Sequence, residues 1–293
     1  LCLPAHAQTP LETCMRERGD KALAACNTAL RQNPKNALAL RSRAAEWQAR
    51  GELDKSLADY NEVLRLGQGN AEDYGHRADL WTTAGEDDKA IDDLSEAIKL
   101  DPNFTAAYFN RGRAYLRKGD TEKALADFTD TIRLDPKMER AYFNRGNAWA
   151  RKRETDKSLA DYDEAVKIDP QADVLVNRCS RHLQKLLFDR ALFDCTIAIQ
   201  LNPKLEIAYH NRGAVHRRMG NWDAAIADYT VALELNPNFV VSNFDRGRAY
   251  ENKNDFAKAL DDYKRYIEFD QNNSEAVEAI ARMTRAMQQP VPK

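Results

Sequence analysis

Residues 105–138 read TAAYFNRGRAYLRKGDTEKALADFTDTIRLDPKM, and this stretch decides the fold. From Ala106 to Lys118 apolar residues recur every three or four positions, which predicts an amphipathic helix. Gly119 follows as a turn, and the same spacing predicts a second helix from Glu122 to Leu134. Pro136 then ends the second helix, because proline has no N–H to continue the hydrogen-bond ladder. The stretch therefore predicts one antiparallel helix hairpin.

The same pattern recurs along the chain at a nearly fixed period. Prolines fall 33 or 34 residues apart, with one position skipped at Gln68, at Pro34, Pro102, Pro136, Pro170, Pro203 and Pro237. Small residues keep the same period at Ala44, Ala78, Gly112, Gly146, Cys179, Gly213 and Gly247. Rings keep it at Trp47, Trp81, Tyr115, Trp149, His182, His216 and Tyr250. Such a period predicts hairpins that stack to bury their apolar faces.

Composition excludes several classes of protein. The 293 residues carry 44 Lys+Arg and 46 Asp+Glu, for a net charge of -2. A nucleic-acid or membrane-surface protein would usually be strongly basic. No apolar run approaches the roughly 18 residues that a membrane-spanning helix needs. We therefore expect a helical chain that is not embedded in a membrane and does not bind nucleic acid.

Several repeating positions match a known family. Tyr108, Gly112, Tyr115, Ala124, Phe128 and Pro136 have the spacing of a tetratricopeptide repeat (TPR), as do Tyr142, Gly146, Trp149, Tyr162 and Pro170. The chain therefore resembles a TPR protein. The resemblance implies an all-α fold, a right-handed superhelical solenoid of antiparallel helix hairpins with a C-terminal capping helix. We expect a shortened unit at 10–36, seven full units at 37–70, 71–104, 105–138, 139–172, 173–205, 206–239 and 240–273, the capping helix at 274–288 and a tail at 289–293.

One position departs from the family pattern in every full unit, where Arg stands in place of the usual Leu. An Asp follows each Arg by sixteen residues, with a hairpin turn midway between them. Residues equidistant from the turn of an antiparallel hairpin face each other, which predicts structural ion pairs Arg43–Asp59, Arg77–Asp93, Arg111–Asp127, Arg145–Asp161, Arg178–Asp194, Arg212–Asp228 and Arg246–Asp262. The alternative is a ladder of ligand-binding arginines, which the counter-charge beside every Arg disfavours.

The N-terminus suggests export. Residues 1–7, LCLPAHA, resemble the remnant of a secretory signal that ends in the small-residue pattern Ala5-x-Ala7. The alternative is an apolar, frayed end of the chain. Cleavage after Ala7 would leave four of the five cysteines, and an even number in an exported chain favours disulfides. We expect export, with the periplasm as the favoured compartment.

The hairpin symmetry also pairs the four cysteines. Cys179 and Cys195 are sixteen residues apart and centred near the turn at Leu187. Cys14 and Cys26 are twelve apart and centred on Asp20, about one helical turn shorter. Both pairs then face across a hairpin within reach of a disulfide, so we predict Cys14–Cys26 and Cys179–Cys195. The alternatives are buried free thiols and, with less support from the spacing, a zinc site.

Motifs for catalysis are missing from the sequence. It contains no G-x-S-x-G sequence, no phosphate-binding glycine loop and no cluster with metal-ligand spacing. The five histidines are scattered, and His182 and His216 occupy core aromatic positions. We expect a protein that is not an enzyme and has no metal or cofactor.

The first helices of TPR hairpins line a concave groove in which family members usually hold peptides or partner helices. Asn110, Asn144, Asn177 and Asn211 recur on these helices and resemble the asparagine ladder of some long TPR superhelices, in which amides grip a peptide backbone. Further polar candidates on the same face are Arg113, Asn147, Arg117, Arg151, Arg217 and Arg248. This basic lining favours an acidic partner. The alternative is that these residues only solvate an exposed helix face.

Together these patterns predict a scaffold that binds an extended or helical segment of a partner protein in its concave groove. The alternative is a targeting or regulatory subunit of an envelope enzyme complex that docks through its convex face or its ends. The patterns do not predict the partner's identity, the pathway or the oligomeric state.

Overall fold

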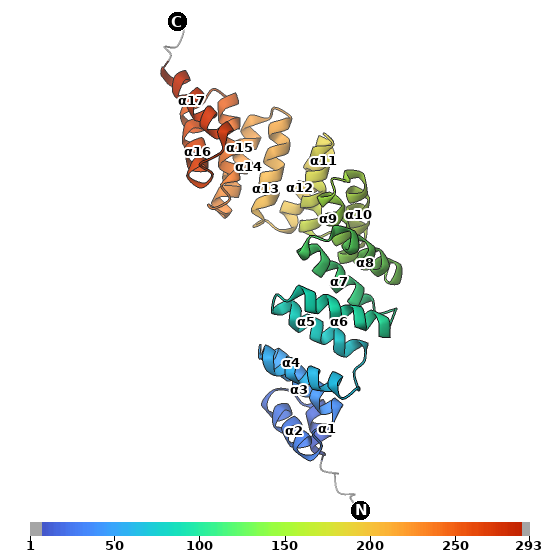
Figure 1. Ribbon diagram of the computed structural model, residues 1–293. Coiled ribbons are helices and arrows are strands. Elements are labelled where there is room, and N and C mark those ends of the chain that lie inside the picture. The colour runs from blue at the N-terminus through green and yellow to red at the C-terminus, as the bar shows by residue number, and fades with distance from the viewer. Residues whose placement is uncertain (1–7, 289–293) are drawn as a thin grey trace, which may run out of the picture. The chain divides into compact units, whose positions relative to one another are not determined.

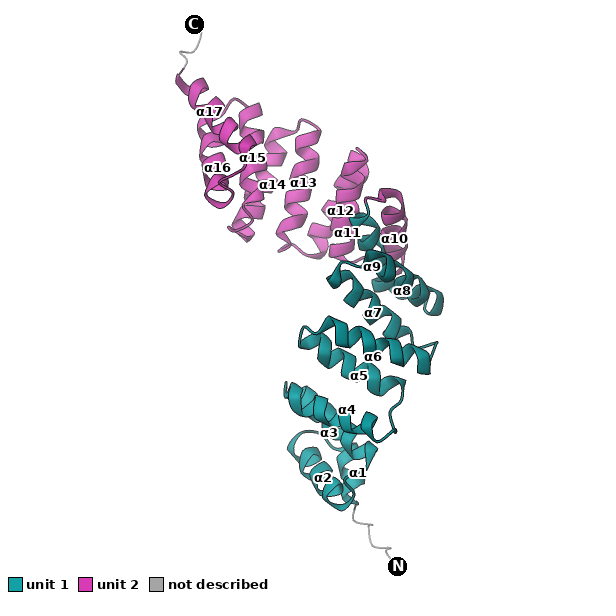
Figure 2. Ribbon diagram, in the orientation of Figure 1, with its two compact units in different colours: residues 1–152 teal, residues 153–293 magenta. Residues whose placement is uncertain are grey.

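The computed structural model describes residues 8–288, which form seventeen α-helices and no strand (Figure 1). The chain divides into two compact units, with the boundary between residues 152 and 153 (Figure 2). This boundary falls inside the predicted repeat 139–172, between its two helices. The right-handed superhelix of the whole chain therefore stays a prediction, and the two units are described separately.

The first unit contains nine helices in four hairpins and one further helix. They are α1 (Pro10–Arg16), α2 (Gly19–Gln32), α3 (Ala37–Ala49), α4 (Leu53–Arg65), α5 (Ala71–Thr83), α6 (Asp87–Leu100), α7 (Thr105–Lys118), α8 (Thr121–Leu134) and α9 (Glu139–Arg151). The second unit contains α10 (Thr155–Ile168), α11 (Ala172–Gln184), α12 (Phe188–Leu201), α13 (Glu206–Arg218), α14 (Trp222–Leu235), α15 (Val241–Asn252), α16 (Phe256–Phe269) and α17 (Ser274–Gln288).

Consecutive helices pack against each other within each unit, and the first helices of successive hairpins are also neighbours. We call the odd-numbered helices α1 to α15 the A helices, and the even-numbered helices the B helices. The surface that the A helices of one unit share is called the A-helix face. In the first unit α5, α7 and α9 follow one another on this face, and in the second unit α11, α13 and α15 do so.

Small residues allow each A helix to lie close to its B helix. A Cβ atom on Gly112 would lie 2.9 Å from the ring of Phe128, and Gly213 and Gly247 face Tyr229 and Tyr263 in the same way. These rings are buried, so they fill the space that glycine leaves open. Cys179 and Cys195 occupy the corresponding two positions in α11 and α12. A disulfide therefore replaces the glycine–ring contact in that hairpin.

The C-terminal helix α17 covers the last hairpin. It buries Ala276, Ala279 and Met283 against a cluster that includes Tyr263 and Phe244. The opposite side of α17 is polar and exposed, as expected for a helix that ends a stack.

The repeated Arg residues each join two or three helices. Six of the predicted Arg–Asp pairs lie within one unit, and in each the Nε and one terminal nitrogen donate to the two carboxylate oxygens at 2.6–2.9 Å. Every one of these carboxylates is at most 6% exposed. Arg145 belongs to the first unit and Asp161 to the second, so that pair stays a prediction.

The other terminal nitrogen of the Arg reaches back to the preceding B helix. Arg111 donates from it to the Ser95 hydroxyl at 3.0 Å, and Arg246 donates to Thr230 at 3.0 Å. The corresponding acceptors in other hairpins are Asn27, Asn61, Thr129 and Asp163, at 2.7–3.2 Å. These polar residues lie fifteen or sixteen positions before the Arg. One guanidinium thus links an A helix to its own B helix and to the previous one.

Candidate functional site

The four cysteines form two disulfides, each within one hairpin. Cys14 and Cys26 join α1 to α2 with their Cα atoms 4.7 Å apart, and Cys179 and Cys195 join α11 to α12 at 5.7 Å. All four side chains are buried. Each bridge links cysteines that lie symmetrically about a hairpin turn. Both disulfides are buried between the two helices of their hairpin, so we assign them a structural role.

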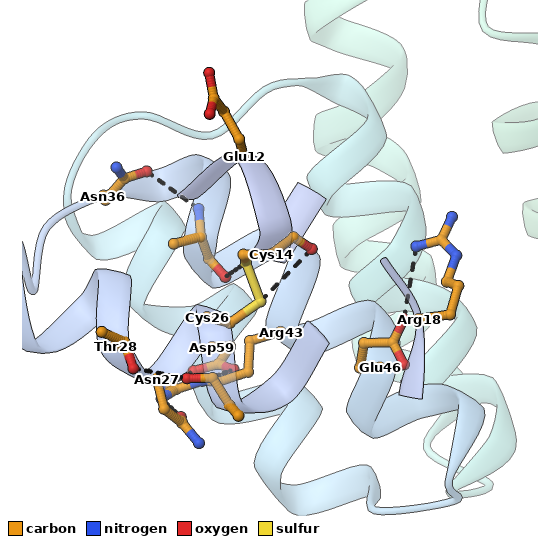
Figure 3. Close-up of a disulfide and its surroundings, with 12 residues drawn as sticks. Glu12, Cys14, Arg18, Cys26, Asn27, Thr28, Asn36, Arg43, Glu46 and Asp59 are labelled. Carbon is orange, nitrogen blue, oxygen red and sulfur yellow. Dashed lines mark hydrogen bonds and ion pairs between the residues drawn. A yellow bond between two sulfur atoms is a disulfide. The ribbon is translucent and has the colours of Figure 1, made fainter. Parts of the chain in front are cut away.

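The shortened first hairpin has a second anchor besides its disulfide (Figure 3). The Glu46 carboxylate, on α3, accepts a hydrogen bond from the Gly19 backbone N–H at 2.8 Å and lies 3.6 Å from the Arg18 guanidinium. Arg18 is the N-cap residue of α2 and its own side chain does not cap the helix. A buried carboxylate from the next hairpin therefore caps α2 and interacts with the positive end of its dipole.

The predicted asparagines lie on the A-helix face, and two of them link neighbouring A helices. Asn110 donates from its side-chain nitrogen to Asp79 at 3.2 Å, which joins α7 to α5. Asn211 donates to the Val176 carbonyl at 3.4 Å, whereas Asn144 donates to Arg140 within its own helix at 2.8 Å. Asn147 and Asn177 also have contacts within the protein. These amides are half-buried, and a peptide would have to compete for their hydrogen bonds.

Most of the predicted arginines are balanced by acids from neighbouring helices. Arg117 pairs with Asp87 at 2.5 Å, Arg217 lies 3.6 Å from Asp245, and Arg248 pairs with Glu275. Arg151 donates to the Leu116 carbonyl at 2.6 Å. The sequence predicts a basic lining, and this is wrong for most of the face. Residue spacing relates positions within one hairpin, so it does not show which acidic residues of an adjacent hairpin lie beside these arginines.

Two exposed arginines of the first unit make no salt bridge with any described residue. Arg113 lies on α7, with its guanidinium carbon 5.8 Å from the centre of the Phe109 ring. Arg140 lies at the start of α9, one helical turn before Asn144. Both are exposed. A basic stretch therefore remains on the A-helix face over α7 and α9.

A hollow of about 300 Å³ opens on the A-helix face between α5 and α7. Leu94, Phe104 and Ala107 form apolar parts of its wall, and Leu94 and Ala107 are each 1% exposed. Its polar lining comprises Glu72, His76, Asp79 and Asn110. The hollow thus combines an apolar wall with two carboxylates, an amide and an imidazole.

Gly75 forms part of the wall of this hollow. The equivalent position in the other full hairpins carries a side chain, at Arg41, Phe109, Phe143, Val176, His210 and Phe244. A Cβ atom on Gly75 would lie 3.1 Å from the Phe104 ring, so even a methyl group would crowd the wall. The Phe104 ring therefore packs against Gly75, and the hollow opens beside this contact. Sequence reasoning missed this site, although comparing position 75 with its equivalents would have marked it.

Burial shifts several titratable groups. It raises the pKa of Asp79, and the nearby positive charges of His76 and Arg113 only partly oppose the shift. Burial also lowers the pKa of His182, against the opposing influence of Asp194. The Nδ1 atom of His182 is buried and has no hydrogen-bond partner among the described residues. His182 therefore serves as a neutral core ring in the position that aromatics fill elsewhere.

A second hollow, of about 380 Å³, lies in the second unit between α10, α11 and α12. Arg178, His182 and Asp194 line it, together with Phe193, which is 63% exposed. This hollow lies against B helices rather than on the A-helix face.

Within residues 8–288, no three His, Cys, Asp or Glu side chains gather closely enough to hold a metal ion. No helix in the same range has the length and apolar character needed to cross a membrane.

Comparison with known families and structures agrees with the hairpin architecture. Models of the tetratricopeptide repeat match residues 109–173, 207–239 and 241–273, and a TPR repeat model matches residues 78–119. No curated protein sequence matches the chain significantly.

Several solved structures share the fold. A tetratricopeptide repeat protein from Parabacteroides merdae has a TM-score of 0.62 at 17% identity, over 85% of this chain and 98% of that one. YrrB, described as a TPR protein with an unusual peptide-binding site, has a TM-score of 0.55 at 20% identity, over 64% of this chain and 96% of that one. PilF from Pseudomonas aeruginosa has a TM-score of 0.58 at 20% identity, over 63% of this chain and 84% of that one. At these identities the likeness shows the fold alone.

Proposed function

This chain is a tetratricopeptide repeat protein, of a family of non-enzymatic protein-interaction modules, and we propose that it binds an extended or helical segment of a partner protein on its A-helix face. The observation that carries this proposal is the hollow between α5 and α7, where Gly75 forms part of a wall that combines apolar and polar groups. Such a mixture of apolar walls and a few convergent polar groups is typical of ligand sites. YrrB, which shares the fold, has a peptide-binding site by its own description.

The charge of the first unit suggests which segments would bind. Arg113 and Arg140 lie exposed on α7 and α9 without salt bridges to described residues, whereas most other arginines on the face are balanced. Acidic residues of a partner segment would find complementary charge there. We therefore retain an acidic stretch in the partner, restricted to the part of the segment that crosses α7 and α9.

The experiment selects phage-displayed random dodecapeptides on the full chain and measures the Kd of the selected peptides by fluorescence anisotropy. We expect the double substitution R113A/R140A to weaken binding at least tenfold, because it removes two exposed charges from the A-helix face. The matched control is R65A/R133A, which removes two exposed arginines from the B helices α4 and α8. The proposal is wrong if the control weakens binding and R113A/R140A does not.

One observation favours the alternative, a targeting or regulatory subunit that docks through its B helices. Phe193 is 63% exposed beside the hollow of the second unit, and it is the largest exposed side chain near that hollow. Substituting Phe193→Ser tests this alternative in the same assay. A loss of binding on F193S, with full binding by R113A/R140A, would move the docking surface to the B helices.

Export of the protein to the periplasm is part of the proposal. Two disulfides within single hairpins support it, because such bonds persist in oxidising compartments. The predicted signal remnant at residues 1–7 lies outside the described residues.

A further inference from the structure

We infer that the hollow between α5 and α7 receives a lysine or arginine side chain of the bound segment. The inference rests on the proposed function, since it names the kind of residue in the bound segment that would contact the A-helix face at this hollow. It concerns only the first unit, where Gly75 forms part of the wall and Glu72 and Asp79 supply negative charge.

The shape of the hollow suits a long side chain. Glu72 and Asp79 are seven residues apart on α5, so their positions are separated by about 10 Å along the helix. Gly75 lies between them and exposes backbone where the equivalent positions present a side chain. Phe104 and Ala106 provide accessible apolar surface in the same hollow. The methylene stem of a lysine or arginine can pack along this surface while its head group reaches a carboxylate at one end.

The charge of the hollow requires a cation. Glu72 makes no salt bridge with a described residue, and Asp79 accepts one hydrogen bond, from the Asn110 amide, which brings no positive charge. His76 and Arg113 both act electrostatically on Asp79, His76 more strongly, but neither makes an ion pair with it. The carboxyl of Asp79 is partly desolvated, as its raised pKa indicates. A bound cation would pair with these two carboxylates, which are exposed to solvent in the free protein.

Other side chains fit the hollow less well. An aspartate or glutamate would be repelled by the two carboxylates that line it. A leucine or phenylalanine would match the apolar wall, but would desolvate Glu72 and Asp79 further without pairing them. The basic stretch formed by Arg113 and Arg140 lies over α7, the helix that carries Asn110, and over α9. The favoured segment therefore carries a basic residue at the hollow, next to acidic residues over α7 and α9.

The first experiment uses a small probe and does not depend on peptide binding. The full chain, labelled with ¹⁵N, is titrated with n-butylguanidinium chloride, and the Gly75 amide and the Asn110 side-chain amide report occupancy by NMR. We expect saturable shifts with a Kd in the millimolar range, and at least fivefold weaker binding to E72Q/D79N. The matched control D92N/E96Q removes two carboxylates from α6 and should bind as the native chain does. Equal shifts with n-pentanol, or unchanged binding to E72Q/D79N, would overturn the inference.

The second experiment fills the hollow. Gly75→Val introduces the residue found at the equivalent Val176, and should abolish the n-butylguanidinium shifts while far-UV circular dichroism stays unchanged. If G75V loses helical structure, E72Q/D79N carries the test, because it preserves the shape of the wall. Retained binding by a folded G75V chain would contradict the inference.

Peptides selected on the full chain separate this inference from the proposed function. Replacing each lysine or arginine by norleucine should weaken binding at least tenfold at one position, and E72Q/D79N should remove that preference. If peptides bind through the A-helix face with no dependence on a basic residue, the inference fails and the proposed function stands. If no peptide binds the A-helix face but n-butylguanidinium binds the hollow, the proposed function fails and the cation site remains.

Discussion

Arg111 shows how a charged residue can occupy a position that is usually apolar. Its guanidinium donates to both oxygens of Asp127 and to Ser95, so one side chain meets acceptors on two B helices. Burial raises the pKa of Asp127 even against the pull of Arg111, so the carboxylate is partly desolvated. The pair therefore stabilises the hairpin only as long as both partners remain.

Removing one partner should cost more than removing both. We expect Arg111→Leu to destabilise the α7–α8 hairpin by about 3 kcal/mol, because it leaves a buried carboxylate without its cation. R111L/D127L should return to within about 1 kcal/mol of the native chain. Native-state hydrogen exchange of amides in α7 and α8 measures both effects. The exposed pair Lys123–Asp120 gives the control, since Lys123→Ala should leave the exchange of these amides nearly unchanged. A double variant less stable than R111L would contradict this interpretation.

His182 should make stability depend on pH. Its pKa in the folded protein lies below the ordinary value of 6.5, so above pH 6.5 the neutral ring is present in both states. As the pH falls below 6.5, the unfolded chain takes up a proton before the folded chain does, and stability decreases through that window. We expect His182→Phe to stabilise α11 and α12 by about 1 kcal/mol, since it also removes a buried unpaired nitrogen. The gain in thermal midpoint should be larger at pH 5 than at pH 8, and an equal gain at both would refute the account.

Sequence spacing predicts half of the arginine network. The Asp sixteen residues after each Arg follows from hairpin symmetry, which relates residues of one hairpin. The acceptor fifteen or sixteen residues before the Arg lies in a different hairpin, and it is Asn, Ser, Thr or Asp according to position. The residue type of this acceptor varies from hairpin to hairpin, so no sequence pattern identifies it. The packed structure identifies it by its distance from the Arg.

At the scale of single elements, the first hairpin needs reinforcement. Helix α1 has only seven residues, too few to be stable by itself. The Cys14–Cys26 bond fastens it to α2, and the Glu46 cap fastens α2 to α3. Terminal units of linear repeats have a neighbour on one side only, so they open more readily than central ones.

Breaking the first disulfide should therefore release one hairpin. We expect C14S/C26S to lower the local unfolding free energy of α1 and α2 by about 3 kcal/mol, the size expected for a loop of this length. Hydrogen exchange of the amides in α1 and α2 would show it, with the amides of α7 and α8 unchanged. C179S/C195S provides the control and should affect α11 and α12 alone. Loss of protection throughout the chain in C14S/C26S would show that the hairpins do not open separately.

Helix positions are easier to predict than the spaces between helices. The small residues, rings and prolines fix where hairpins begin and turn, because each acts within one hairpin. The hollow beside Gly75 is lined by residues of two successive hairpins, and the Phe104 ring of the second hairpin packs against Gly75 of the first. The balance of Arg117 by Asp87, and of Arg248 by Glu275, depends on the same kind of contact between hairpins. Contacts between hairpins such as these can be identified only from the packed structure.

At the scale of the whole molecule, the chain is a stack of TPR hairpins in two compact units, without motifs for catalysis in its sequence. The proposed export makes a definite prediction for its thiols. Non-reducing peptide mapping of protein from the envelope fraction of its native host should join Cys14 to Cys26 and Cys179 to Cys195. Four alkylatable thiols in that material, or a peptide joining Cys14 to Cys179, would contradict the proposed export and the pairing.

The central claim is that partner segments bind the A-helix face. Hydrogen exchange of the full chain, with and without a saturating selected peptide, tests it most directly. We expect the largest gain in protection in α5 and α7, around Gly75 and Asn110, with little change in the B helices α6 and α8. Protection confined to the B helices, or centred on Phe193 in α12, would contradict the claim.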